Sequence, residues 1–121
     1  MSALVWIGVA LLSGAGALLR FGLHTAVQRR TQGAFPSGTL AVNILGSLLL
    51  GVLHGAGVGG DAMLLSGTAL LGSFTTFSTW MLETASLSEH GQNRLALANL
   101  GVSLALGLAA VALGWAIGAA F

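Results

Sequence analysis

Four long apolar stretches make up most of this chain, and very few charged residues interrupt them. The sequence has four Lys or Arg and three Asp or Glu among 121 residues, whereas about a quarter of a soluble domain is charged. A helix of about 20 apolar residues is long enough to cross the hydrocarbon core of a bilayer. The sequence therefore predicts an all-α, multi-pass membrane protein with one domain over residues 1–121. The membrane spans are expected at about 3–26, 37–56, 62–88 and 95–120.

Several function classes are disfavoured by what the sequence lacks. It contains no cysteine, so neither disulfides nor thiol-bound metals are expected. The net charge of +1 comes from very few groups and does not indicate a nucleic-acid partner. His24, His54 and His90 are far apart and show no metal-ligand spacing. Because no nucleophile–base pair is visible either, we do not expect an enzyme.

The third apolar stretch contains a polar run that a simple membrane anchor would not need. Four hydroxyl side chains alternate there with aromatic rings, namely Thr75, Thr76, Ser78 and Thr79 with Phe74, Phe77 and Trp80. Glycine, serine and β-branched threonine favour a helix break over residues 72–79. At membrane depth, the freed carbonyls of such a break can hold a cation while hydroxyl and amide hydrogens face an anion. The alternative is an intact helix whose hydroxyls bond to the carbonyls one turn earlier.

Other polar residues interrupt the first and second stretches. Thr39, Asn43 and Ser47 are one helical turn apart and form a polar stripe. Such a stripe either joins two helices by hydrogen bonds or lines a pore, where the Asn43 amide offers donors to an anion. Arg20 lies near the end of its span, where it can extend to the headgroups or attract an anion into a vestibule. Glu83 either ends a polar path or pairs with a basic group.

Glycines recur at helical spacing in the second and fourth stretches. Gly51 and Gly55 are four residues apart, as are Gly114 and Gly118. Small residues at this spacing let membrane helices approach closely. Four short helices have little interior, so we also expect much of their surface to pack against a second subunit.

Three motifs in order make the chain similar to a known family. TTFSTW at residues 75–80 closely resembles the TTFSTF signature of the Fluc (CrcB) fluoride channels. GAGALLRF at residues 14–21 and GTLAVNILGSLLLG at residues 38–51 resemble the other two motifs of that family. The resemblance implies a third helix broken in mid-membrane and an antiparallel, dual-topology dimer with two narrow pores. It also implies export of cytoplasmic fluoride, and hence fluoride resistance, in a prokaryotic inner membrane.

The resemblance assigns roles to individual residues. Phe77 would be the first member of a phenylalanine box whose positive ring edges face the anion, and Asn43 would donate to fluoride in the same pore. The hydroxyls of the polar track would come from Ser78 and Thr79, with Thr39 and Ser103 as further pore positions. Arg20 would border the vestibule, and Glu83 would stand near the pore end. A structural Na⁺ at the centre of the dimer would be bound by the carbonyls of Gly72 and Thr75.

The chain departs from the family pattern at two positions. Trp80 stands where the second phenylalanine of the box is expected, and Ser73 replaces the second glycine of a GG pair. Tryptophan is bulkier than phenylalanine and adds an indole N–H, so it could narrow, retune or close a pore. These readings stay open at the level of the sequence.

The basic residues are unevenly placed along the chain. Arg29, Arg30 and Arg94 fall in the first and third loops, whereas the side with the termini has no Lys or Arg. This bias favours one orientation and pairing with a paralogous subunit, although a homodimer is the default expectation. A small multidrug transporter would need an acid in the first span, where the chain has Arg20 instead. A non-conducting assembly subunit would leave the polar run unexplained.

Overall fold

The first helix is the longest element of the protein, whose computed structural model describes residues 2–121. Helix α1 (Ala3–Thr31) begins where the Ser2 hydroxyl accepts a hydrogen bond from the Val5 N–H at 3.2 Å. It continues past the expected end at Ala26 and stops at Gln32, which has a left-handed backbone with φ of 46°. Arg29 and Arg30 in its last turn favour this extension, because positive charge stabilises a helix C-terminus.

The loop after α1 is held by one side chain. The Gln28 amide donates to the Phe35 carbonyl at 3.2 Å and accepts from the Gly38 N–H at 2.9 Å. The second bond satisfies a free N–H in the first turn of α2 (Ser37–Gly55), which Pro36 precedes. The loop and the start of α2 are therefore fixed against the end of α1.

The third apolar stretch is divided into several segments. It begins with the short helix α3 (Gly60–Met63), continues through the π-helical segment η1 (Leu64–Leu71), and ends its first half with α4 (Gly72–Phe74). Thr75 has an extended backbone, with φ of −88° and ψ of 165°, and helix resumes only at α5 (Ser78–Glu89). The break predicted within residues 72–79 is observed, and the intact-helix alternative is wrong. Its placement in mid-membrane stays a prediction.

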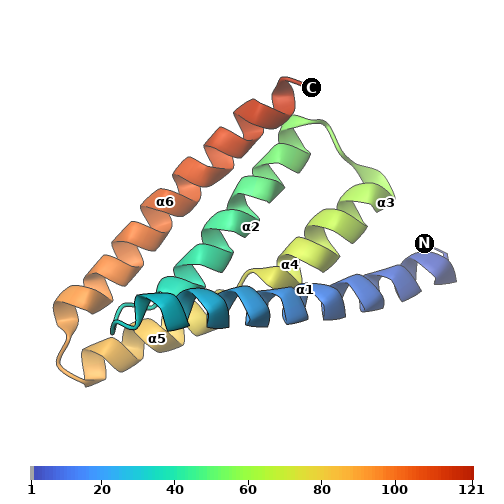
Figure 1. Ribbon diagram of the computed structural model, residues 1–121. Coiled ribbons are helices and arrows are strands. Elements are labelled where there is room, and N and C mark those ends of the chain that lie inside the picture. The colour runs from blue at the N-terminus through green and yellow to red at the C-terminus, as the bar shows by residue number, and fades with distance from the viewer. Residues whose placement is uncertain (1) are drawn as a thin grey trace.

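Helix α6 (Asn93–Ala119) runs beside α2 in the same direction over most of its length (Figure 1). The predicted close packing through glycines is confirmed at this contact. A Cβ at Gly51 would collide with the Val111 carbonyl oxygen, and a Cβ at Gly114 would collide with that of Leu48. Each helix therefore presents glycine to the backbone of the other, which is the closest packing that two helices can reach.

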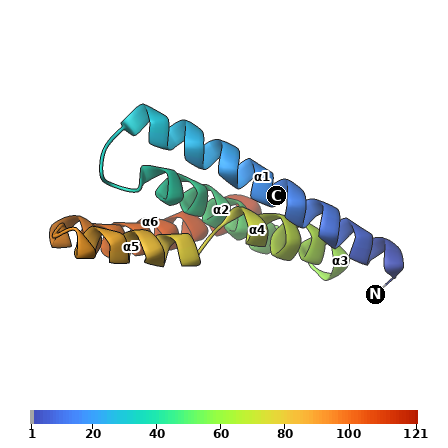
Figure 2. The ribbon, with the colours of Figure 1, turned by 90° about the horizontal axis from the view of Figure 1, so that it is seen from below.

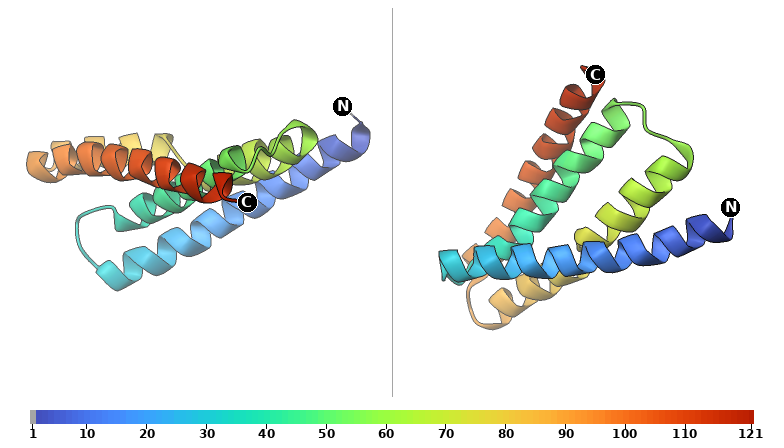
Figure 3. Two further views of the ribbon diagram at one scale, coloured as in Figure 1. Left: turned by 90° about the horizontal axis from the view of Figure 1, so that it is seen from above. Right: turned by 45° about the vertical axis from the view of Figure 1, so that its right-hand side comes forward.

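The remaining helices are arranged around α2. Helix α1 lies on one face of the molecule, and α5 with α6 lie on the other side of α2 (Figure 2). α1 crosses η1 and α4, whereas α5 packs against the beginning of α6. The right-hand view in Figure 3 shows the linker that joins α2 to α3 at the same end of the molecule as the C-terminus.

Within residues 2–121, three helices are long and apolar enough to cross a membrane, namely α1, α2 and α6. The broken stretch from Gly60 to Glu89 is not among them, because no single helix in it has sufficient length. Many large apolar side chains of α1 and α6 are exposed, including Leu4, Leu11, Leu104 and Trp115. Such surfaces suit lipid or a second protein chain rather than water. The multi-pass membrane class is thus supported by the structure.

Candidate functional site

The break between α4 and α5 is held by the side-chain amide of Asn43 on α2. Its Oδ1 accepts from the Thr76 N–H at 2.8 Å, and its Nδ2 donates to the Thr76 carbonyl at 2.9 Å. One amide therefore satisfies both backbone groups of the residue in the middle of the break. An Asn amide has two N–H donors, and only one of them is used in this pair of bonds.

The four hydroxyls of the polar run have different partners. The Thr75 hydroxyl donates to the Leu71 carbonyl one turn earlier at 3.0 Å. The Thr76 hydroxyl accepts from the Thr79 N–H at 3.1 Å and so caps the first turn of α5. Ser78 is exposed, and its hydroxyl lies 3.4 Å from that of Thr76. Within residues 2–121, no partner is recorded for the Thr79 hydroxyl, so Ser78 and Thr79 keep hydrogen-bonding capacity for another group.

Two aromatic rings stand at the start of α5. Phe77 and Trp80 are arranged edge to face, with ring centroids 5.8 Å apart and an interplanar angle of 89°. The Phe77 side chain is 69% exposed, which is unusual for a large apolar residue beside a polar break. The Trp80 indole N–H donates to the Asn99 carbonyl on α6 at 3.0 Å. The extra donor that tryptophan brings to this position is therefore already bonded.

Glu83 belongs to a second polar cluster, one turn beyond Trp80 on α5. The Thr39 hydroxyl, which is only 1% exposed, donates to Glu83 Oε1. His24 on α1 brings its Nε2 to 3.8 Å from Glu83 Oε2. The Thr39 side chain therefore bonds to Glu83 and not to Asn43, although Thr39 and Asn43 are one turn apart on α2. The sequence did not single out His24 for this role, because only the fold brings α1 to Glu83.

An open groove of about 760 Å³ lies between α2, η1 and α6. Its walls include four of the seven residues expected in the pore, namely Asn43, Phe77, Trp80 and Ser103, and both residues expected to bind sodium, Gly72 and Thr75. The groove is not lined by the other three expected pore residues, namely Thr39, Ser78 and Thr79. It is not lined by Arg20 or Glu83 either, which were expected at the vestibule and the pore end. Arg20 is half-buried on α1, on the other side of the bundle from α6.

The end of α4 leaves backbone carbonyls without helical partners. The helical ladder ends with the Thr75 N–H, which donates to the Leu71 carbonyl at 3.0 Å, and the next N–H, that of Thr76, goes to Asn43. In the described residues, the carbonyl of Gly72 thus lacks its usual acceptance from Thr76. Carbonyl oxygens at a helix C-terminus carry partial negative charge and suit a hard cation. This chemistry fits a cation held by Gly72 and Thr75, the two residues expected to bind sodium.

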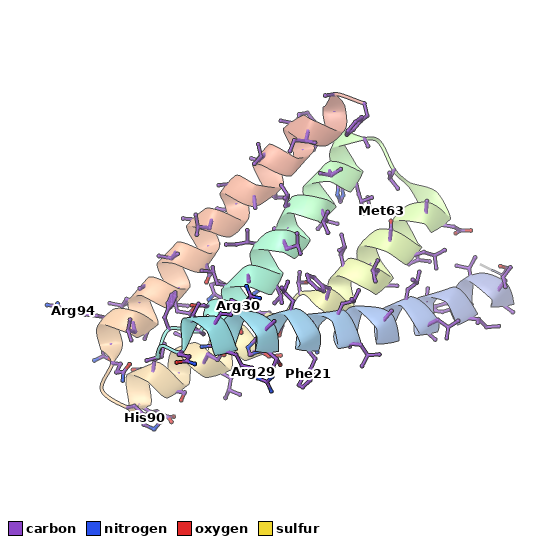
Figure 4. All side chains as sticks on the ribbon, viewed as in Figure 1. Phe21, Arg29, Arg30, Met63, His90 and Arg94 are labelled. Carbon is purple, nitrogen blue, oxygen red and sulfur yellow. The ribbon has the colours of Figure 1, made fainter. Side chains whose placement is uncertain are left out.

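Most of the basic charge of the chain lies at one end of the molecule. Arg29, Arg30 and Arg94 lie where α1 ends and α6 begins, as Figure 4 shows. The C-terminus and the linker between α2 and α3 lie at the opposite end (Figure 1). The three arginines are therefore gathered at one end of the molecule, but they lie in the last turn of α1 and the first turn of α6 rather than in the loops where the sequence placed them.

Comparison with known proteins gives a consistent result. Residues 7–115 match the family model described as CrcB-like protein, Camphor Resistance (CrcB). The fluoride-specific ion channel FluC 2 of Mycolicibacterium paratuberculosis is 54% identical over 110 residues, covering 91% of this chain and 90% of that protein. The fluoride-specific ion channel FluC 1 of Rubrobacter xylanophilus is 50% identical over 108 residues, covering 88% of this chain and 87% of that protein.

Proposed function

This chain belongs to the CrcB family and is a membrane ion-channel protein rather than an enzyme, and we propose that it conducts fluoride selectively. One observation carries the proposal. The break in the third stretch is held open by Asn43 directly beside the edge-to-face rings of Phe77 and Trp80. Amide hydrogens and ring edges, both weakly positive, are thereby placed together on one groove.

The chemistry of this groove suits a small and strongly hydrated anion. A pore for such an ion has to replace its water shell with closely placed donors, without a charge that would trap it. The unused Nδ2 hydrogen of Asn43 and the ring edge of Phe77 are such groups. The hydroxyls of Ser78 and Thr79 extend the donors along α5, and Ser103, whose hydroxyl donates to Asn99 Oδ1 at 3.4 Å, lies on the groove wall on α6. We propose that fluoride passes along these residues, down its electrochemical gradient and out of the cytoplasm.

A second subunit would complete this pathway. Phe77 is 69% exposed, and the groove beside it is open. A large apolar side chain in that state needs either lipid or protein over it, and an anion path needs protein. We propose that a second copy in antiparallel orientation covers the groove and forms two pores with the first. Arg20 would then border the vestibule, and Glu83 with Thr39 would form the far end of each path.

A structural sodium ion fits the same arrangement. The carbonyl of Gly72 is freed by the break, and Thr75 follows it in extended conformation. We propose that these two carbonyls contribute to a Na⁺ site shared by the two subunits. When bound, the ion would neutralise the negative ends of two α4 helices and so stabilise the break.

A paralogous partner is the second candidate for the other subunit. Arg29, Arg30 and Arg94 are gathered at one end of the chain, so the positive-inside rule favours that end in the cytoplasm. Symbiobacterium thermophilum has relatives named fluoride-specific ion channel FluC 1 and FluC 2, and both match this chain. A chain with fixed orientation would pair with an oppositely oriented paralogue. Equal labelling of tagged termini on both sides of a prokaryotic inner membrane would exclude it.

Fluoride efflux from liposomes tests the proposed function. The purified chain alone is reconstituted, and fluoride and chloride release are followed after a potassium ionophore is added. Rapid release of fluoride with retention of chloride is the expected result for a homodimeric channel. Release of both ions would contradict selectivity. Release of neither from a folded protein would favour the paralogous partner, and its addition should then restore fluoride release.

A further inference from the structure

Asn99 on α6 is a polar residue in an unusual environment. It is 0% exposed, on a helix that carries many exposed leucines. Burying an amide is unfavourable unless its donors and acceptors are bonded. Its hydrogen bonds therefore indicate what the residue does.

The Asn99 Nδ2 and backbone carbonyl bond to α5, while its Oδ1 accepts from the Ser103 hydroxyl on α6 at 3.4 Å. Its Nδ2 donates to the Thr84 hydroxyl at 2.8 Å, and that hydroxyl donates to the Trp80 carbonyl at 2.8 Å. Since the single hydroxyl hydrogen of Thr84 is used in the second bond, its oxygen is free to accept from Asn99. The Asn99 backbone carbonyl accepts from the Trp80 indole N–H at 3.0 Å. Trp80 is thus held at its ring and, through Thr84, at its backbone.

This arrangement decides which part of Trp80 faces the groove. Trp80 lines the groove together with Phe77, and its one N–H is directed to α6. The ring therefore presents carbon and C–H groups to the groove rather than a hydrogen-bond donor. In this respect it offers an anion what a phenylalanine at the same position would offer.

We propose that Asn99 and Thr84 are positioning residues for the pore, and that they fix the Trp80 ring so that its indole N–H stays out of the anion path. The proposal rests on the proposed function for its transport consequence. A free indole N–H beside the path would bind anions and slow their passage. It would also admit larger anions, because an N–H donor binds them without the close approach that a ring edge requires. The hydrogen bonds to α6 would thus keep conduction fast and selective for fluoride.

The first test is spectroscopic and does not depend on conduction. The chain has three tryptophans, and Trp6 and Trp115 are 58% and 57% exposed. In ¹⁵N-labelled protein, each indole N–H signal is assigned by Trp→Phe substitution of one residue at a time. We expect the Trp80 signal to lie downfield of the other two, because its N–H is hydrogen-bonded to the Asn99 carbonyl. A Trp80 signal at the chemical shift of Trp6 and Trp115 would overturn the proposal.

The second test measures fluoride efflux in a double-mutant cycle. Asn99→Leu keeps the side-chain shape and the backbone carbonyl, but it removes the side-chain N–H that bonds to Thr84 and to the Trp80 carbonyl. Trp80 is then no longer fixed against α6 through its backbone, and we expect the ratio of fluoride to chloride efflux to fall by about tenfold. In a Trp80→Phe background the same change should lower it less than about threefold, because the indole is gone. Asn93→Leu, at the exposed start of α6, is the matched control and should leave the ratio unchanged.

Thr84→Val keeps the cycle informative if Asn99→Leu does not fold. It removes the hydroxyl that links Asn99 to Trp80, and it should shift the Trp80 indole signal toward those of the exposed tryptophans. Equal effects of Asn99→Leu or Thr84→Val with and without the Trp80 indole would show a purely structural role and would overturn the proposal. If the wild-type chain shows no fluoride efflux but its Trp80 indole signal lies downfield of the other two, the result would contradict the proposed function only.

Discussion

The α2–α6 pair and the broken third stretch satisfy their backbone hydrogen bonds in different ways. Both lie among apolar residues, where every backbone N–H and C=O needs a partner. Helices α2 and α6 stay continuous and use Gly51 and Gly114 to bring their backbones together. The third stretch opens at Thr75 and takes the missing partners from the Asn43 side chain.

Because of this difference, the α2–α6 contact forms the scaffold of the bundle, and the break forms the candidate site. The glycine contact leaves no polar group free and no space for an ion, so it can only hold the bundle together. The break leaves an unused amide hydrogen of Asn43 and the exposed Phe77 on one groove, and it leaves the hydroxyls of Ser78 and Thr79 free on α5 outside the groove wall. α2 takes part in both regions, because Gly51 faces α6 while Asn43 faces the break. Substitutions can therefore disturb one region with limited effect on the other.

The largest effect on folding is expected in the scaffold. Gly114→Val would place a side chain against the Leu48 carbonyl and the Val52 backbone, and these atoms can move only if α2 and α6 separate. We expect no folded protein from detergent extraction, measured by size-exclusion chromatography. Gly101→Val is the matched control on α6, where a Cβ meets nothing within 4 Å. Recovery of folded Gly114→Val would show that the scaffold is less tightly packed than the glycine contacts indicate.

A smaller effect on folding is expected where the two regions meet. Asn43→Leu keeps the side-chain shape but leaves the Thr76 N–H and carbonyl without partners, at a cost of about 2–4 kcal/mol. We expect a lower thermal midpoint in detergent, near-normal helix content by circular dichroism, and loss of fluoride efflux. An unchanged thermal midpoint would mean that Asn43 does not hold the break.

The Thr39–Glu83 contact between α2 and α5 should be less sensitive to substitution still. Thr39→Val removes the hydrogen bond to Glu83, with an expected cost of about 1–2 kcal/mol in the free energy of unfolding. Fluoride efflux should fall only a few-fold, because Thr39 and Glu83 do not line the groove. Thr31→Val is the matched control, since its hydroxyl bonds only within α1. Equal thermal midpoints for the two variants would argue against a role for the Thr39–Glu83 bond.

The scaffold could be predicted from sequence because its signals are local. Apolar length predicted the helices, and the spacing of Gly51, Gly55, Gly114 and Gly118 predicted a close helix contact. The break was also visible, since glycine and threonine weaken a helix wherever they are found together. The ends of the helices were less well predicted, because the extension of α1 depends on Gln28 bonding to a loop that folds back on it.

The partners within the site could not be predicted, because they join residues far apart in the sequence. Nothing local indicates that Asn43 bonds to Thr76, that Thr39 bonds to Glu83, or that His24 lies beside that carboxyl. The indole of Trp80 was expected to alter the pore as a new donor, yet it is bonded to Asn99. The sequence assigned no role to Asn99, since a single Asn carries no sign of what it will contact.

Phe77→Ile asks whether the ion passes along the broken stretch rather than along the α2–α6 scaffold. Phe77 is 69% exposed, so we expect a change of less than about 1 kcal/mol in the free energy of unfolding. Phe121→Ile is the matched control, because Phe121 is 92% exposed at the end of the chain. In liposomes, folded Phe77→Ile should release no fluoride above background, while Phe121→Ile should match the wild type. Wild-type fluoride efflux through Phe77→Ile would contradict a path along the break.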